Sequence, residues 1–329
     1  MELARTELQI ATDTAVRAAG RTLAVTGSQE QAIAAADRLL KANPYANQTM
    51  DLSGTDIIFG VSTRVSESER YSFSNGQKPN AVQIRANGNN RVPMLFPTMG
   101  IPIDYRPIKT AISTQMELDV ALIIDRSGSM AYSVSEIAGN GPPAAAPPGW
   151  IFGMPVPPHA RWLDATAAID GFLTLLSQTA QEEQVSLSTY SDQAKDDLAL
   201  SNNYDGIRTK LSQYGLVFRG GATNIGGGII AGTSTLSRKK VARPWATRVM
   251  IILSDGIHNT GTDPVYAATL AAKENISIYT VTFSNEADIA TMQQVAAIGM
   301  GKHIHAVTGA ELMKAFQDIA KSLPTLITY

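Results

Sequence analysis

A five-residue stretch, 125–129, carries three oxygen-bearing side chains at alternate positions. Asp125, Ser127 and Ser129 can turn to the same side of a tight loop, because the glycine between the serines permits a sharp bend. Hydroxyl and carboxylate oxygens, without sulfur or imidazole, are the ligands that Mg2+ and Mn2+ prefer, and Ca2+ also accepts them. The types and spacing of these residues therefore favour a site for a hard divalent cation.

Two later segments carry further oxygen ligands. Thr223 lies in the glycine-rich stretch 220–224 and precedes a predicted helix, and Asp255 follows closely on the apolar run 249–253. The first stretch also follows an apolar run, 120–124. Unbroken apolar runs are typical of parallel strands buried on both faces, and ligands of open α/β sheets bind beyond the carboxyl ends of such strands. We therefore expect the three segments to meet at one edge of a sheet.

Helices and strands alternate along the rest of this region, as they do in a doubly wound sheet. The predicted fold class is α/β, with a mostly parallel, Rossmann-like sheet and a second, smaller α+β domain. Periodicity and capping signals separate the helices from shorter strand-like runs. We predict helices at 159–180, 204–214, 225–236, 264–274, 287–298 and 310–323, and strands at 185–190, 198–200, 248–254, 276–283 and 303–307.

In chain order, Asp-x-Ser-x-Ser at 125–129, then Thr223, then Asp255 resemble the metal-ion-dependent adhesion site of von Willebrand factor A domains. The resemblance covers residues 117–324. It implies a metal ion with one open coordination position, which the family uses to bind a Glu or Asp carboxylate of a partner protein.

The resemblance also implies a role for each residue of the motif. Ser127 and Ser129 are expected to bind the ion through their hydroxyls, and Thr223 to bind it directly or nearly so. Asp125 and Asp255 are expected to supply negative charge, either directly or through bound water. Mg2+ commonly keeps several waters in its shell, so such a mixed set suits it.

Each of these residues also has an ordinary structural interpretation. The serines can cap turns, Thr223 can cap the following helix, and Asp255 can form a turn with the next glycine. Their joint occurrence at three strand-end loops favours the metal site. A hydrolase set of Ser127, His258 and Asp255 is conceivable, but Ser127 lacks the Gly-x-Ser-x-Gly setting of such nucleophiles. We therefore predict that the protein is not an enzyme.

A segment rich in proline, glycine and alanine, 131–160, interrupts the predicted domain after the first metal-binding stretch. Its proline pairs disfavour a helix or a central strand, and long loops in compact domains are commonly functional or disordered. Two interpretations stay open: a lid or specificity loop, or a tethered insertion whose aromatic residues pack down. The candidate ligand-binding residues are Trp150 and Phe152 in this segment, Asn224 beside Thr223, and His258, which either lines the pocket or faces solvent.

The first part of the chain, 1–116, is predicted to be a separate α+β domain. Small apolar residues at helical spacing predict a helix at 3–25, and a second helix is expected to begin at Ser28 and to end before Pro44. The second domain is placed at 117–324, and 325–329 form a C-terminal tail that can return towards the first domain. Strand-like runs of the first domain lie at 57–61, 71–73, 81–85 and 103–116.

Three segments of the first domain, 7–20, 80–84 and 111–116, resemble TadE/TadG-type pilus assembly proteins. This resemblance implies a pilin-like layout of helix and sheet in a TadG-like protein of a tight-adherence (Flp) pilus. It also implies a location in the cell envelope or at the extracellular surface. In that family a hydrophobic membrane anchor precedes the first helix, so we expect an anchor upstream of residue 1.

The composition excludes several other functions. Of the 329 residues 44% are hydrophobic, and a net charge of −2 gives no drive towards nucleic acid. The chain has no cysteine, which excludes disulfides, thiol catalysis and cysteine-bound zinc. We predict a minor pilin or pilus-associated surface protein that mediates cation-dependent protein binding and adhesion. The alternative is a structural subunit that primes or caps a filament and binds other pilus subunits.

Overall fold

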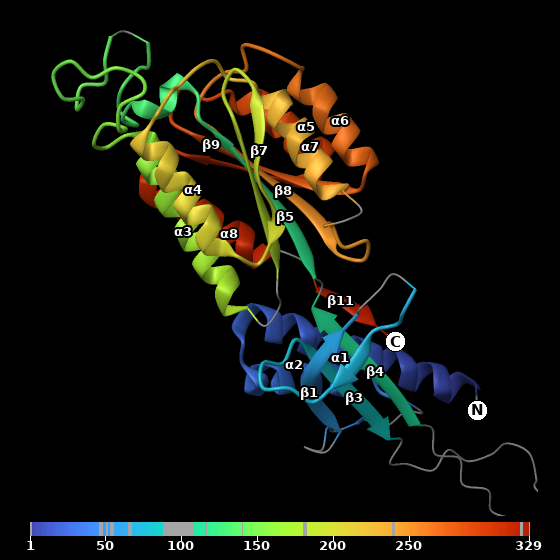
Figure 1. Cartoon of the computed structure of the whole chain (residues 1–329). Helices are drawn as coiled ribbons and strands as arrows, with labels where there is room; N and C mark the ends of the chain where they lie inside the picture. Colours follow the sequence, from blue (N-terminus) through green and yellow to red (C-terminus); the bar gives the residue numbers. More distant parts are fainter. Residues whose placement is uncertain are drawn as a thin grey trace, which may run out of the picture. The chain divides into compact units, whose positions relative to one another are not determined.

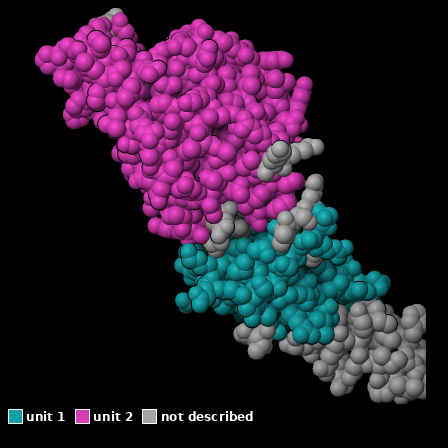
Figure 2. All heavy atoms as spheres, viewed as in Figure 1, with its two compact units in different colours: residues 1–116, 324–329 teal, residues 117–323 magenta. Residues whose placement is uncertain are grey.

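Contacts between residues divide the chain into two compact units (Figure 2). Unit 1 comprises residues 1–116 and 324–329, and unit 2 comprises residues 117–323. Unit 2 is therefore inserted in the sequence between two parts of unit 1. The computed structural model describes residues 2–45, 49–50, 52, 56–64, 68–87, 108–115, 117–139, 141–179, 183–238, 241–322 and 325–328.

Among the described residues of unit 2, six strands form one sheet in the order β10-β9-β8-β5-β6-β7. Neighbouring strands are parallel, except that β7 at one edge is antiparallel to β6. This confirms the predicted mostly parallel α/β fold, although β7 is longer than the strand predicted at 198–200. The strands are β5 (Leu118–Asp125), β6 (Gln184–Tyr190), β7 (Ala194–Ser201), β8 (Thr247–Ser254), β9 (Ile276–Phe283) and β10 (Met300–Ala306).

Helices cover both faces of this sheet, which makes the fold doubly wound (Figure 1). One face packs against α3 (Arg161–Gln178), α4 (Tyr204–Leu216) and α8 (Gly309–Ser322). The other face packs against α5 (Ile225–Leu236), α6 (Pro264–Lys273) and α7 (Ile289–Ile298).

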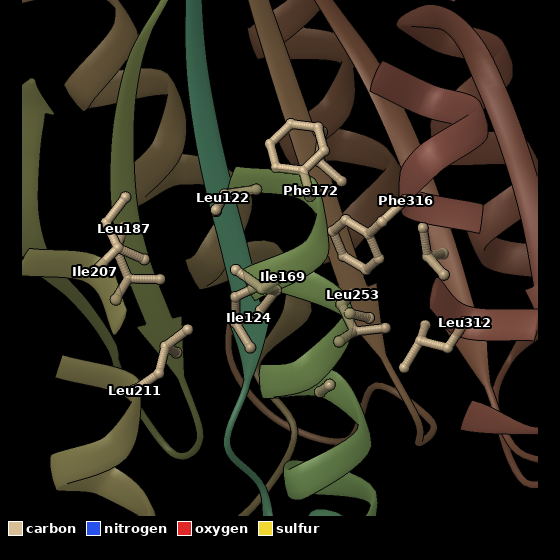
Figure 3. Close-up of a cluster of buried hydrophobic side chains, with 14 of the residues drawn as sticks. Leu122, Ile124, Ile169, Phe172, Leu187, Ile207, Leu211, Leu253, Leu312 and Phe316 are labelled. Carbon is tan, nitrogen blue, oxygen red and sulfur yellow. The ribbon is translucent and has the colours of Figure 1, made fainter. Parts of the chain in front are cut away.

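Strand β5 lies at the centre of the core, and all of its side chains are buried. Leu122 and Ile124 point into the cluster that α3 and α8 complete, where the rings of Phe172 and Phe316 meet edge to face at 5.9 Å (Figure 3). Ile123 points into the cluster on the opposite face. Because β5 is packed on both faces and paired on both edges, its carboxyl end is held firmly in place.

Glycines let α5 approach the sheet and a neighbouring loop closely. A Cβ atom at Gly228 would lie 2.7 Å from the Tyr190 ring and 2.8 Å from the side chain of Ile123. A Cβ at Gly226 would lie 1.8 Å from the carbonyl oxygen of Thr262. Only a residue without a Cβ atom fits at these positions. The glycine-rich start of α5 is thus explained by packing.

The described strands of unit 1 form an antiparallel sheet in the order β11-β4-β3-β1-β2. Helix α1 (Glu2–Thr26) lays a stripe of alanine and leucine side chains against this sheet and α2 (Gln29–Ala42). Ser28 caps α2 as predicted, because its hydroxyl accepts a hydrogen bond from the backbone nitrogen of Gln31 (3.2 Å). The strands are β1 (Ile57–Thr63), β2 (Ser72–Ser74), β3 (Ala81–Asn87), β4 (Ile108–Gln115) and β11 (Thr325–Thr328).

Residues 325–328 of the segment expected to be a C-terminal tail form β11, a strand of the unit 1 sheet. It pairs antiparallel with β4, and Thr325 is the register partner of Gln115. An edge strand offers unpaired backbone groups, so a short segment can pair there without a sequence signal of its own. In the part of the chain that the structure describes, no helix combines the length and apolar character that a bilayer crossing requires.

The packing of α5 yields a test with two helical glycines. Gly226→Ala is expected to lower the stability of unit 2 by about 1–3 kcal/mol or more, because the new methyl group meets backbone atoms that cannot move aside. The control is Gly171→Ala in α3, where a Cβ would make an ordinary 3.8 Å contact with Met313. That change should stabilise by about 0.5–1 kcal/mol. Thermal unfolding measures both, and equal effects would contradict the packing argument.

Candidate metal centre

Three loops at one edge of the unit 2 sheet bring the predicted ligand residues together. Asp125 is the last residue of β5, and Asp255 follows directly after β8. These strands are parallel neighbours, so both carboxylates emerge at the same end of the sheet. Thr223 stands in the loop before α5, where the backbone of Gly128 donates to the carbonyl of Gly221 at 2.9 Å.

The side chains of the first and third loops are connected by hydrogen bonds. The hydroxyl oxygens of Ser127 and Ser129 lie 3.0 Å apart, and the Ser129 hydroxyl donates to Asp255 Oδ1 at 2.8 Å. Asp125 is held by the protein through both oxygens. The backbone nitrogen of Ser127 donates to Oδ1 at 2.8 Å and the Ser254 hydroxyl donates to Oδ2 at 2.7 Å. These bonds fix the positions of the side chains.

Gly256 marks the point where the hydroxyls of two loops converge. A Cβ atom at this position would lie 3.4 Å from Thr223 Oγ1 and 3.5 Å from Ser129 Oγ. The Thr223 loop is fixed by Asn259, whose side-chain oxygen accepts from the Thr223 nitrogen at 2.8 Å. Asn259 was not predicted as a site residue. Its sequence signal is weak, because Asn is common in turns such as the one that follows Asp255.

A cleft of about 600 Å³ opens over this cluster. The described residues hold no group of three or more His, Cys, Asp or Glu side chains that could bind a metal. The donor set is instead two carboxylates and three hydroxyls, which are hard oxygen ligands and fit Mg2+ or Mn2+. The lining includes Ser127, Ser129, Thr223, Asp255, Tyr132, Ala138, Phe152, Ile257, Asn259 and Glu286.

Burial dominates the electrostatics of the two carboxylates. Desolvation raises the pKa of Asp125, and the hydrogen bonds from Ser127 and Ser254 act against this shift. Desolvation also raises the pKa of Asp255, with a further increase from the charge of Asp125, while Arg161 lowers it. Two desolvated, mutually repelling carboxylates are what a bound dication would stabilise.

An ion pair that the sequence did not reveal holds Asp255. Arg161 is fully buried, and its Nη1 lies 2.8 Å from Asp255 Oδ2. Its Nη2 lies 2.6 Å from Glu286 Oε2. The one sequence signal was a cation in the first turn of a helix, where the helix dipole disfavours it. This signal indicates that Arg161 needs an acidic partner, but it does not identify the partner.

The two aromatic candidates of the insertion have different positions. Phe152 is 44% exposed and lines the cleft. Trp150 is buried, and its indole nitrogen donates to the carbonyl of Pro155 at 2.7 Å. The two rings meet edge to face at 5.1 Å, so Trp150 supports Phe152 and does not line the cleft.

The other two candidates have structural partners or lie beside the cleft. Asn224 is the N-cap of α5, where its Oδ1 accepts from Gly227 at 2.8 Å and its Nδ2 donates to the carbonyl of Asp192 at 3.1 Å. Both polar atoms of Asn224 are therefore used by the fold. His258 is half-buried and is not among the residues that line the cleft.

The energetic cost of burying the charge of Asp125 can be tested on metal-free protein. In chelator at pH 8, Asp125→Asn should raise stability by about 1–3 kcal/mol, because it removes a desolvated charge and keeps an acceptor for Ser127. Asp119 is the control: burial also raises the pKa of its carboxyl group, but Arg243 Nε donates to it at 2.9 Å, so loss of its charge breaks an ion pair. Asp119→Asn should lower stability by about 1–3 kcal/mol. Thermal unfolding compares them, and a loss of stability in both variants would contradict the argument.

Comparison with known protein families gives a match that lies within unit 2. Residues 158–319 match the model of the von Willebrand factor type A domain. This range starts at the end of the insertion and ends within α8. No curated protein gives a match.

Several solved structures are similar at low sequence identity. An aerotolerance-related membrane protein from Bacteroides fragilis is 17% identical, with 62% of this chain and 98% of that chain covered and a TM-score of 0.44. The mussel byssus proximal thread matrix protein 1 with a zinc-occupied MIDAS motif is 16% identical, with 65% and 47% covered and a TM-score of 0.47. A mutant of the PilB minor pilin from Streptococcus sanguinis is 15% identical, with 80% and 84% covered and a TM-score of 0.46.

The family match lies within unit 2, the unit that contains the mostly parallel sheet. Unit 2 of this chain contains a von Willebrand factor type A domain.

Proposed function

We propose that this protein binds another protein through a divalent cation held at the edge of the unit 2 sheet. The ligands would be the hydroxyls of Ser127, Ser129 and Thr223, with Asp125 and Asp255 supplying negative charge directly or through water. The observation that carries this proposal is the convergence of hydroxyl and carboxylate oxygens from three loops under one open cleft. Von Willebrand factor A domains are in general interaction modules, which agrees with this assignment.

The partner would offer a carboxylate of Glu or Asp to the ion. Mg2+ or Mn2+ fits the oxygen donors best, and Ca2+ accepts the same ligand types with a larger shell. A dication balances the charges of Asp125 and Asp255, and an incoming carboxylate then meets the attraction of the ion in a partly desolvated cleft. Phe152 and Ile257, both exposed at this cleft, add apolar contact area next to the ion.

The finer proposal is a TadG-like, pilus-associated surface protein of the cell envelope. Its support is the sequence resemblance of segments 7–20, 80–84 and 111–116, together with a unit 1 in which a long helix packs on an antiparallel sheet. A filament-assembly subunit would use the same centre with a pilus subunit as its partner. The identity of the captured protein separates the two roles.

Metal binding tests the centre directly. Calorimetric titration of chelator-stripped protein with Mg2+ or Mn2+ should give saturable binding. Ser129→Ala should weaken it by at least about tenfold, because one ligand and the hydrogen bond to Asp255 are lost together. Ser177→Ala is the matched control, since Ser177 is an exposed serine of α3 that does not line the cleft. Equal affinities in the parent protein and Ser129→Ala would exclude the proposed ligand set.

Partner capture tests the function. Immobilised parent protein and Ser177→Ala, loaded with Mg2+, should retain an envelope protein that EDTA releases, and Ser129→Ala should retain much less of it. The control that matters is the same capture in the presence of chelator. Retention that is unaffected by chelator and by Ser129→Ala would show that the protein binds its partner without the ion.

A further inference from the structure

One buried guanidinium contacts both the candidate metal centre and the insertion. Arg161 donates from Nη1 to Asp255 Oδ2 at 2.8 Å. It also reaches the first limb of the insertion, which we define as residues 132–139. There Nη2 donates to the carbonyl of Glu136 at 2.6 Å, and Nε donates to the carbonyl of Ser133 at 3.2 Å. The side chain is fully shielded from solvent.

Glu286 adds a second connection between the same partners. Its Oε2 accepts from Nη2 of Arg161 at 2.6 Å, and the backbone nitrogen of Ala138 donates to both carboxylate oxygens, each at 3.1 Å. Ala138, Gly139 and Glu286 all line the cleft over the candidate metal centre. The first limb therefore forms one wall of that cleft and is held in place by its hydrogen bonds to Arg161 and Glu286.

The geometry of this anchor suits arginine and not lysine. A guanidinium is planar and always charged, and it presents several donors in fixed directions, so it can bind two carboxylates and two carbonyls at once. A buried charge of this kind is stable only while its partners are in place. Movement of the first limb would leave Arg161 and Glu286 with unpaired donors and acceptors, which opposes a freely swinging lid.

The second limb, residues 150–156, is held by different contacts. The backbone nitrogen of Gly153 donates to the carbonyl of Phe218 at 2.7 Å, and the Phe218 nitrogen donates to the carbonyl of Met154 at 3.1 Å. These bonds hold Phe152 close to the loop that carries Thr223, where a Cβ atom at Gly220 would lie 2.7 Å from the Phe152 ring. Because they do not involve Arg161, the second limb serves as an internal reference for experiments on the first.

We propose that Arg161 is a positioning residue that joins the metal centre to the insertion. It fixes Asp255 for the ion and, with Glu286, holds the first limb as a wall of the cleft. Because the first limb and Phe152 both line the cleft over the ion, they contact a partner that inserts a carboxylate there, which makes the insertion a specificity element. The part that concerns the ion rests on the proposed function, and the anchoring of the first limb does not.

Hydrogen exchange of the full chain in chelator tests the anchoring. Glu286→Gln removes the charge but keeps the shape, so the amide of Ala138 should exchange at least about tenfold faster, while the amide of Gly153 is unchanged. Arg161→Lys should have the same effect on Ala138. Arg208→Lys, which alters an exposed ion pair with Asp170, is the control. Parent-like protection of Ala138 in both test variants would overturn the anchoring.

Magnesium titration of the same proteins tests the positioning of Asp255. If Arg161 acted only through its charge, Arg161→Met would bind Mg2+ more tightly, because a repelling cation is removed. Positioning predicts the opposite, a loss of at least about tenfold, with Arg161→Lys and Glu286→Gln within about threefold of the parent. Parent-like or tighter binding by Arg161→Met would overturn the positioning role. An absence of binding by the parent would overturn the proposed function, while the exchange result would still decide the anchoring.

Discussion

The burial of two carboxylates at the ends of neighbouring strands is the constraint on which the rest of unit 2 depends. Asp125 and Asp255 are both shielded from water, and this desolvation raises the pKa of each carboxyl group. The fold offsets the cost of burial with a backbone amide, a serine hydroxyl and the guanidinium of Arg161. These contacts do not fully offset the burial, since the pKa of both carboxyl groups stays raised, and sites that bind ligands commonly retain such unfavourable terms.

The surrounding packing follows from the need to hold three loops at one point. Strand β5 is rigid because both of its faces are buried, and α5 carries the Thr223 loop close to it by means of Gly226 and Gly228. A helix packed less closely would move the Thr223 hydroxyl away from Ser129. The close approach of α5 to β5 therefore helps to position the short oxygen-bearing side chains at the sheet edge, because both elements are rigid.

Sequence and structure agree most closely where the pattern is local. The unbroken apolar runs before Asp125 and Asp255 indicated buried parallel strands, and the predicted fold class is confirmed. The network around Arg161 was not predictable in the same way, because its carboxylate partner lies 94 positions further along the chain and no periodicity connects them. Strand β11 escaped prediction because four residues carry too little pattern and their pairing depends on the edge that β4 offers.

The insertion of unit 2 between β4 and β11 has a consequence for how the protein folds. Thr325 and Gln115 are register partners, although all of unit 2 separates them in the chain. Closing so long a loop is entropically unfavourable for an unstructured chain, and non-local pairing of this kind slows folding. A folded unit 2 brings its two ends to neighbouring positions in advance. Folding of unit 2 before this pairing would shorten the loop to be closed, and β11 can join the sheet of unit 1 only after the far end of the chain has been synthesised.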